Sequence, residues 1–184
     1  DRTSRGLGDV YKRQGMAVSQ TSSGTQEYGD GGAYEGEFLN GLPHGNGTYE
    51  LPNGYRYVGE WFEGEINGQG EALFPNGSVY IGSFVKGKPE GSGKITFTDG
   101  GTYEGEWANG SITGEGYAKY ANGTTYQGTF LDAMHDGKGI MKSPDGYIYD
   151  GTWENGVKQG KATVTYPDGS IYTGEVSQLS LIHI

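Results

Sequence analysis

The sequence has no cysteine, few basic residues and only three histidines. Without cysteine the chain can form no disulfide, no thiolate nucleophile and no cysteine-ligated metal site. Lysine and arginine number 13 against 23 acidic residues, which gives a formal net charge of −10. A chain this acidic is not expected to bind nucleic acid, whose affinity comes from cationic contacts to phosphate, or to be drawn to anionic lipid by charge.

The two ends of the chain differ in character from its middle. The codons GAT GTG TAT AAG AGA CAG encode Asp9 to Gln14, and their reverse complement encodes Leu179 to Ile184. One inverted DNA repeat read in frame accounts for both ends, and it resembles the transposase recognition ends used to build sequencing libraries. We therefore predict that residues 1–14 are an adapter-derived, disordered tail, that 179–184 are a second such tail, and that the parent protein extends beyond both.

Without the predicted tails the net charge is more negative. Residues 15–178 contain 9 basic and 21 acidic side chains, a net charge of −12. The imbalance is strongest in residues 15–78, where nine acids face Arg56 alone. Residues 79–178 contain eight lysines against twelve acidic residues, so the imbalance there is smaller.

The many glycines and tyrosines of the middle are periodic. A tyrosine recurs every 23 residues, with glycine two places later and phenylalanine or tryptophan four places later. Six whole repeats run through residues 34–171, a degenerate partial repeat occupies 15–33, and residues 172–178 begin a truncated seventh. The residues that define the repeats are Tyr34, Gly36, Phe38, Tyr57, Gly59, Trp61, Tyr80, Gly82, Phe84, Tyr103, Gly105, Trp107, Tyr126, Gly128, Phe130, Tyr149, Gly151 and Trp153.

One unit, "YVGEWFEGEINGQGEALFPNGSV" from Tyr57, reads as a β-hairpin. Its first part alternates with period two, which indicates a strand with one aromatic face. We expect a longer loop over 62–67, a second strand opened by Gly68 and Gly70, and a tight turn at Pro75-Asn76-Gly77 that links to the next hairpin. Stacked hairpins of this kind predict an all-β fold, an elongated single-layer antiparallel meander in which tyrosine and tryptophan rings lie over glycines.

The units "YEGEFLNGLPHGNGTYELPNG" from Tyr34 and "YEGEWANGSITGEGYAKYANG" from Tyr103 resemble MORN repeats (membrane occupation and recognition nexus). The resemblance covers nearly all of residues 24–176 and implies an interaction or assembly module. Three positions depart from the pattern: Ala133 replaces a loop glycine, Ser143 a second-strand aromatic and Ala162 a glycine. We expect these to loosen the fifth and sixth repeats locally.

No set of residues predicts catalysis, a cofactor or a metal. His44 and His135 lie four repeats apart, about 40 Å at the spacing of adjacent strands, and we expect both to be solvated loop residues. The pairs Glu35/Glu37 and Glu104/Glu106 place two carboxylates within about 7 Å on one strand face, as acid–base chemistry requires. The solvent face of an acidic sheet gives the same pattern, so we predict no catalytic role for them.

The predicted function is a non-enzymatic scaffold that binds a protein partner along an extended β surface. The candidate partner-binding residues are aromatics outside the repeat template: Tyr49, Tyr55, Phe62, Tyr117 and Tyr147. The alternative is that these rings pair across strands within the sheet. An exposed edge at each cut end also predicts edge-to-edge self-association of this fragment.

Three other functions remain open. The resemblance also fits an accessory module of a larger enzyme, such as a lipid kinase or a methyltransferase. It fits a membrane or phosphoinositide-binding module too, which the negative charge disfavours. Rows of aromatic rings could instead stack on glycans in a secreted protein.

Overall fold

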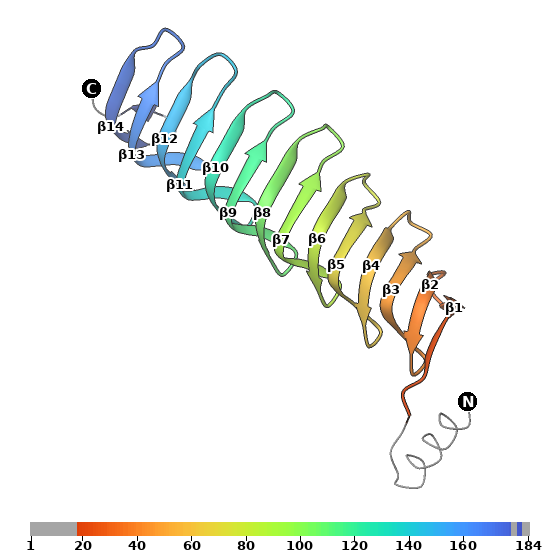
Figure 1. Ribbon diagram of the computed structural model, residues 1–184. Helices are drawn as coiled ribbons and strands as arrows, with labels where there is room; N and C mark the ends of the chain where they lie inside the picture. The colour runs from red at the N-terminus through yellow and green to blue at the C-terminus, as the bar shows by residue number, and fades with distance from the viewer. Residues whose placement is uncertain (1–17, 178–179, 182–184) are drawn as a thin grey trace.

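The computed structural model describes residues 18–177 and 180–181, and it consists of one antiparallel sheet whose 15 strands follow one another in chain order. Figure 1 shows the strands side by side in a single elongated layer, so the predicted meander is confirmed. The strands are β1 Thr21–Glu27, β2 Ala33–Leu39, β3 Leu42–Glu50, β4 Arg56–Phe62, β5 Glu65–Leu73, β6 Val79–Val85, β7 Lys88–Thr96, β8 Thr102–Ala108, β9 Ser111–Lys119, β10 Thr125–Leu131, β11 Met134–Lys142, β12 Ile148–Glu154, β13 Val157–Thr165, β14 Ile171–Ser177 and β15 Ser180–Leu181.

Most of the predicted tails lie outside the described residues. Residues 1–14 and 182–184 belong to this part, so the expectation of disorder there stays a prediction. Within the second predicted tail, the two-residue strand β15 pairs with β14, Ser177 facing Ser180. In the described part of the chain no helix has the length and apolar character needed to cross a membrane.

The two connections of each repeat are the reverse of what the sequence predicted. The prediction of a longer loop at 62–67 is wrong, because β4 ends at Phe62 and β5 begins at Glu65. Glu63 and Gly64 form the whole turn with φ of 47° and 88°. Positive φ at both central residues is the type I′ geometry, whose twist matches that of the paired strands.

The Pro75-Asn76-Gly77 connection, expected to be tight, is the longer one and joins Leu73 to Val79. Gly77 N donates to Phe74 O at 2.9 Å, and Phe74 N donates to Ser78 O at 2.9 Å. The Asn76 side chain closes the loop by accepting from Ser78 N at 2.8 Å. Hydrogen bonds to the backbone therefore order this longer loop.

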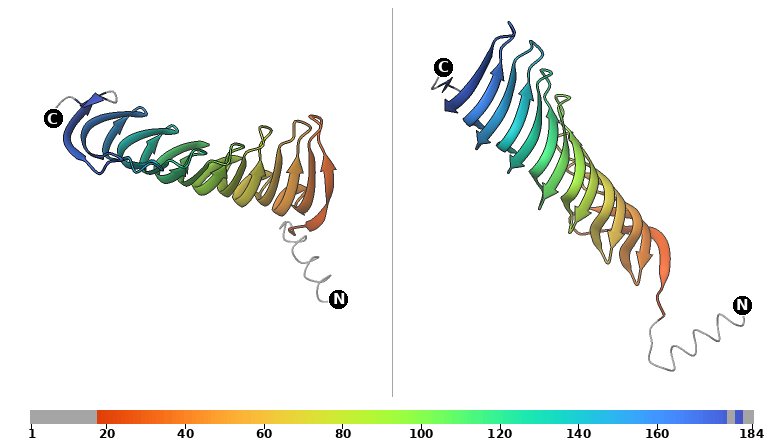
Figure 2. Two further views of the ribbon diagram at one scale, coloured as in Figure 1. Left: turned by 90° about the horizontal axis from the view of Figure 1, so that it is seen from above. Right: turned by 60° about the vertical axis from the view of Figure 1, so that its left-hand side comes forward.

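A β-bulge lies within every repeat. In the β4–β5 hairpin the register shifts between Gly59 and Trp61, and the same shift recurs in the other five repeats. Asn67, Gly68 and Gln69 have no partner on β4 in this register, and Gly68, which pairs with Phe84 of β6, has a φ of 109°. A bulge bends its strand and increases the local twist, and Figure 2 shows strands that are curved along their length.

One side chain covers each bulge. The Glu60 carboxylate accepts a hydrogen bond from Gln69 N across the gap. In the fifth repeat the hydroxyl of Thr129 takes this place and donates to the carbonyl oxygens of Asp136 and Lys138. These contacts satisfy backbone groups that the bulge removes from the ladder.

The core is a row of aromatic rings along one face of the sheet, here called the aromatic face. Tyr57 and Tyr80 are 0% exposed although no second layer covers them. In the first five repeats the ring lies over a glycine pair: a Cβ added to Gly70 would meet Tyr57 Cε2 at 2.4 Å. Glycine is therefore required there because the ring occupies the space of a side chain. In the sixth repeat Ala162 replaces one of these glycines.

Hydrogen bonds fix these rings. Tyr57 Oη donates to Glu60 O at 2.8 Å, and the same bond recurs from every repeat tyrosine between Tyr34 and Tyr172. Trp61 Nε1 donates to Gly47 O in the preceding repeat at 3.2 Å. Successive repeats are thus joined by ring contacts as well as by the strand ladder, for example Tyr57 against Phe84 at 5.0 Å between ring centroids.

Candidate functional site

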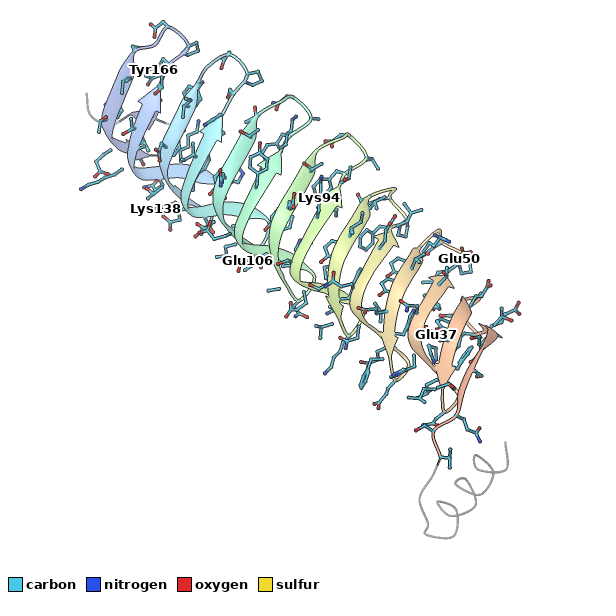
Figure 3. The ribbon with its side chains drawn as sticks, in the orientation of Figure 1. Glu37, Glu50, Lys94, Glu106, Lys138 and Tyr166 are labelled. Carbon is cyan, nitrogen blue, oxygen red and sulfur yellow. The ribbon has the colours of Figure 1, made fainter. Side chains whose placement is uncertain are left out.

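The aromatic face is the candidate functional surface because it is not fully closed by its own side chains. Exposed charged residues such as Glu35, Glu71 and Glu104 alternate with buried residues of the aromatic face and so lie on the opposite face. Figure 3 labels Glu37 and Glu50 toward the N-terminal end of the array and Lys94 and Lys138 further along it. Two hollows open on the aromatic face, one near each of these regions.

The first hollow, here called the N-terminal hollow, has a volume of about 390 Å³. Three aromatic rings form its wall: Tyr49 lies 6.2 Å from Tyr28 and 5.8 Å from Trp61 between ring centroids, in edge-to-face contacts. Asp30 and Glu65 are its acidic lining residues, and Glu65, which pairs with Phe62 in the register, lies at its edge. Ile66, Gly64, Lys86 and Gly87 complete the lining.

Burial and the Asp30 carboxylate raise the pKa values of the tyrosines in this hollow. Burial raises the pKa of Tyr49, and the nearby Asp30 carboxylate raises it further. The same two causes raise the pKa of Tyr28. Asp30 itself accepts a hydrogen bond from Gly32 N at 2.8 Å, which holds its carboxylate beside the rings.

The second hollow, here called the central hollow, has a volume of about 280 Å³ and a more apolar lining. Its main walls are Phe97, Tyr103, Ile112, Tyr120 and Phe130. It opens where Gly101 occupies the place that Tyr55 and Tyr147 hold in other repeats, because glycine leaves this part of the face without a side chain.

His135 is not the solvated loop residue that the sequence predicted. It lies on β11 and faces Phe130 in the register, where the second and fourth repeats have Ile66 and Ile112. Its ring stacks on Tyr126 with centroids 3.7 Å apart and an interplanar angle of 1°. Burial lowers its pKa from 6.5 to about 4, so the imidazole is neutral at physiological pH.

His135 also has a polar partner. Its Nε2 lies 2.6 Å from the hydroxyl of Tyr120, one of the walls of the central hollow. The sequence signal was present but missed, since the register of the repeat places residue 135 in the apolar column and not in the turn. His44 was also expected in a loop; it lies instead on β3, where Nδ1 accepts from Glu63 N at 3.1 Å.

Lys158 occupies the same column in the sixth repeat, facing Trp153. Its ammonium lies 4.6 Å from the ring centroid of Tyr147 and 5.4 Å from that of Tyr149. It donates a hydrogen bond to the Tyr147 hydroxyl at 3.0 Å. Distances below about 6 Å are in the range of cation–π attraction.

Burial keeps the repeat tyrosines protonated. It raises the pKa of Tyr80, Tyr103 and Tyr149 to about 12. It also raises the pKa of Tyr57 and Tyr126. Their hydroxyls therefore remain hydrogen-bond donors throughout the physiological range, and none is a candidate nucleophile.

The structure divides the five candidate partner-binding residues between the two faces. Tyr49 lines the N-terminal hollow. Tyr55 and Tyr147 also lie on the aromatic face and contact Phe74 and Tyr166 respectively. Phe62 and Tyr117 are on the opposite side, 52% and 44% exposed. Sequence periodicity could not separate them, because an added aromatic residue is equally compatible with either face of a pleated strand.

The paired carboxylates have structural partners. Glu37 accepts from Asn46 N at 2.5 Å, and Glu106 accepts from Glu115 N, so both cover bulges. Across the residues that the structure describes, no group of three or more histidine or acidic side chains is placed to hold a metal ion.

The comparison with known protein families identifies the same six repeats. The model of the MORN repeat family matches residues 34–54, 57–79, 80–102, 103–125, 126–146 and 149–171. No curated protein matches the chain.

Two solved structures have a similar fold. The TCP domain of Drosophila melanogaster SAS-4 (dCPAP), in complex with a proline-rich motif of Ana2 (dSTIL), is 9% identical with a TM-score of 0.50. The similarity covers 84% of this chain and 88% of that one. The TCP10 domain of Danio rerio CPAP, in complex with a STIL peptide, is 15% identical with a TM-score of 0.47, covering 84% and 72%.

Proposed function

This chain belongs to the MORN repeat family, and from that premise we propose that it is a non-enzymatic scaffold that binds an extended protein segment along its aromatic face. The observation that carries the proposal is the pair of ring-lined hollows on that face. Repeat arrays present elongated surfaces of this kind to their partners. Aromatic-lined grooves suit extended, proline-rich segments, whose conformation is already ordered before binding.

The fold neighbour supports a peptide partner. The Drosophila TCP domain, whose fold is similar to that of this chain, is in complex with a proline-rich motif. An extended segment here could contact both hollows, since about five strand spacings of roughly 4.8 Å separate them. This distance of about 24 Å corresponds to about eight residues of polyproline II helix.

A selection experiment tests the proposal. Random linear peptides displayed on phage are selected on this chain, and the recovered peptides are measured by calorimetry against two variants. Ile112→Ser changes the central hollow, whereas Ile140→Ser makes the same change on the opposite face, where Ile140 is 37% exposed. We expect saturable binding that Ile112→Ser weakens and Ile140→Ser leaves unchanged.

Two results would overturn this function. One is the recovery of no peptide that binds saturably. The other is binding that Ile140→Ser weakens and Ile112→Ser does not. Anionic vesicles containing phosphoinositide, tested at physiological salt, form a separate arm. Saturable vesicle binding in the absence of peptide binding would favour the membrane module, against the direction that the negative charge indicates.

A further inference from the structure

The N-terminal hollow combines aromatic rings with an excess of negative charge. Its wall is formed by Tyr28, Tyr49 and Trp61. The charged residues of its lining are Asp30, Lys86 and Glu65, of which Glu65 is an exposed residue at the edge of the hollow. Ring faces attract cations because of their quadrupole, most strongly in tryptophan and tyrosine. Carboxylates beside the rings add charge-assisted hydrogen bonds for a guanidinium or an ammonium.

We propose that this hollow binds a positively charged side chain, an arginine or a lysine, of the extended segment that the scaffold takes as partner. The inference rests on the proposed function, because it assigns the chemistry of one residue in that partner. It commits to a basic peptide and predicts that an acidic or neutral peptide of the same length binds less tightly.

Charge complementarity supports this occupant. Residues 15–78 contain nine acidic side chains and Arg56 as their one basic residue. Arg56 is already paired, since its Nε lies 2.9 Å from Glu50 Oε1. The hollow thus lies in the part of the array with the largest excess of acidic residues, which favours the approach of a cationic segment.

The far end of the same face already holds a cation against aromatic rings. Lys158 places its ammonium over Tyr147, Tyr149 and Trp153, at 4.6, 5.4 and 5.9 Å from the ring centroids. Among the described residues no carboxylate forms an ion pair with it. The rings of this face therefore accommodate a cation by themselves, and the N-terminal hollow has Asp30 beside a similar wall and Glu65 at its edge.

Two substitutions remove the negative charge with little change of shape. Asp30→Asn keeps the acceptor that Gly32 N uses, and Asn76 and Asn122 already hold the equivalent loops in this way, at 2.8 and 2.9 Å. Glu65→Gln changes an exposed residue at the start of β5. A matched control, Glu35→Gln with Glu71→Gln, removes the same charge from exposed positions on the opposite face.

The probe is a capped peptide of alternating proline and arginine, compared with analogues that carry citrulline or glutamate in place of arginine. Citrulline has nearly the same shape as arginine without its charge. Calorimetry on the unmodified chain gives the affinities. A variant with Trp107→Phe and Trp153→Phe leaves Trp61 as the sole tryptophan and so reports contact at the hollow. Phenylalanine is the native residue at this place in alternate repeats.

We expect the citrulline analogue to bind about tenfold more weakly than the arginine peptide, which is the loss of one charge-assisted contact. Asp30→Asn with Glu65→Gln should weaken the arginine peptide by about the same factor and leave the citrulline analogue unchanged. The control pair should change the affinity less than about twofold, because salt screens exposed charges beyond about 8 Å. Lys86→Ala should tighten the arginine peptide, because it removes the one cation of the hollow.

Two outcomes separate this inference from the proposed function. If the arginine and citrulline peptides bind equally, or if the control pair weakens binding as much as the hollow pair, the hollow does not recognise charge and the inference is overturned. The scaffold function survives that result if selected peptides still depend on Ile112. If those peptides do not bind the aromatic face at all, the proposed function fails first.

Discussion

Replacing one strand glycine tests the packing that holds this sheet together. In the third repeat Gly93 lies beneath the ring of Tyr80, and a Cβ built at Gly93 would be 2.1 Å from Tyr80 Oη and 2.3 Å from Cζ. The ring has no room to retreat, because Tyr80 is 0% exposed and its hydroxyl donates to Ser83 O at 2.8 Å. Gly93→Ala must therefore displace the ring.

The expected loss of stability is about 2 kcal/mol. Overpacking a filled core costs about 1–3 kcal/mol, and a weakened tyrosine hydrogen bond costs about 1 kcal/mol. Alanine recovers about 0.5–1 kcal/mol because it loses less backbone freedom on folding than glycine does. The sixth repeat shows the direction of the strain. There Ala162 takes the equivalent place, and Tyr149 lies 4.9 Å from Trp153, whereas the Tyr57–Trp61 distance is 5.7 Å.

Urea unfolding, followed by tryptophan fluorescence, measures the effect. The control is Gly24→Ala, which is in the same place in the repeat but has nothing within 4 Å of the added Cβ. We expect the control to lie within about 0.5 kcal/mol of the parent chain. Adding Tyr80→Phe to Gly93→Ala should recover part of the loss, because the hydroxyl is the nearest atom. A Gly93→Ala variant as stable as the control would refute the reasoning.

The structure also predicts the direction of three further changes in the free energy of unfolding. Ala133→Gly should raise the free energy of unfolding by about 0.5–1 kcal/mol, seen as a higher urea midpoint. Ala133 has a φ of 65°, and a left-handed residue other than glycine costs about 1–2 kcal/mol, part of which the greater backbone entropy of glycine offsets. A lower midpoint would contradict this. Burial lowers the pKa of His135 from 6.5 to about 4, so the stability from its neutral ring is complete above pH 6.5 and is lost as the pH falls toward 4. The difference between the two pKa values corresponds to about 3 kcal/mol, which solvent screening of the half-buried ring reduces to about 2 kcal/mol. His135→Ile should flatten that part of the stability profile, and an unchanged slope would argue against the buried neutral ring. Glu60→Ala should cost about 1 kcal/mol by leaving Gln69 N without its acceptor. Glu60→Thr should restore part of this in the same urea assay by donating to carbonyl oxygens of the bulge, as Thr129 does in the fifth repeat.

The period and the aromatic face were predictable from the sequence because both depend on the alternation of side chains along a strand. Tyr57, Gly59 and Trp61 share one face in the structure as the period of two requires. The pairing of ring and glycine was predictable as well, since a glycine that recurs beside a large side chain has a packing reason.

The connections were not predicted correctly because polar residues were interpreted as loop. Glu65 to Gln69 continue the second strand, and their polar side chains point to solvent across a bulge. Asn-Gly pairs such as Asn109-Gly110 are typical of type I′ turns. The same pair also occurs in the longer loops, as at Asn76-Gly77, so it does not by itself separate the two connections.

The hollows could not be predicted from the repeat because they depend on the positions at which the repeats differ. The central hollow opens at Gly101, and the N-terminal hollow depends on how Tyr28 and Asp30 pack against the second repeat. Departures from a repeat can be identified in a sequence, but the space that they open depends on how neighbouring side chains in the sheet fill it.

Methyl-labelled isoleucine in NMR spectra tests the central claim most directly, because the chain carries isoleucines on both faces. Ile66, Ile95 and Ile112 pack on the aromatic face, and Ile81 and Ile140 are exposed on the other. When a selected peptide is titrated to saturation, the account predicts shifts at Ile66 and Ile112 and unchanged signals at Ile81 and Ile140. Shifts confined to Ile81 and Ile140 would show that the partner binds the opposite face and would contradict the account.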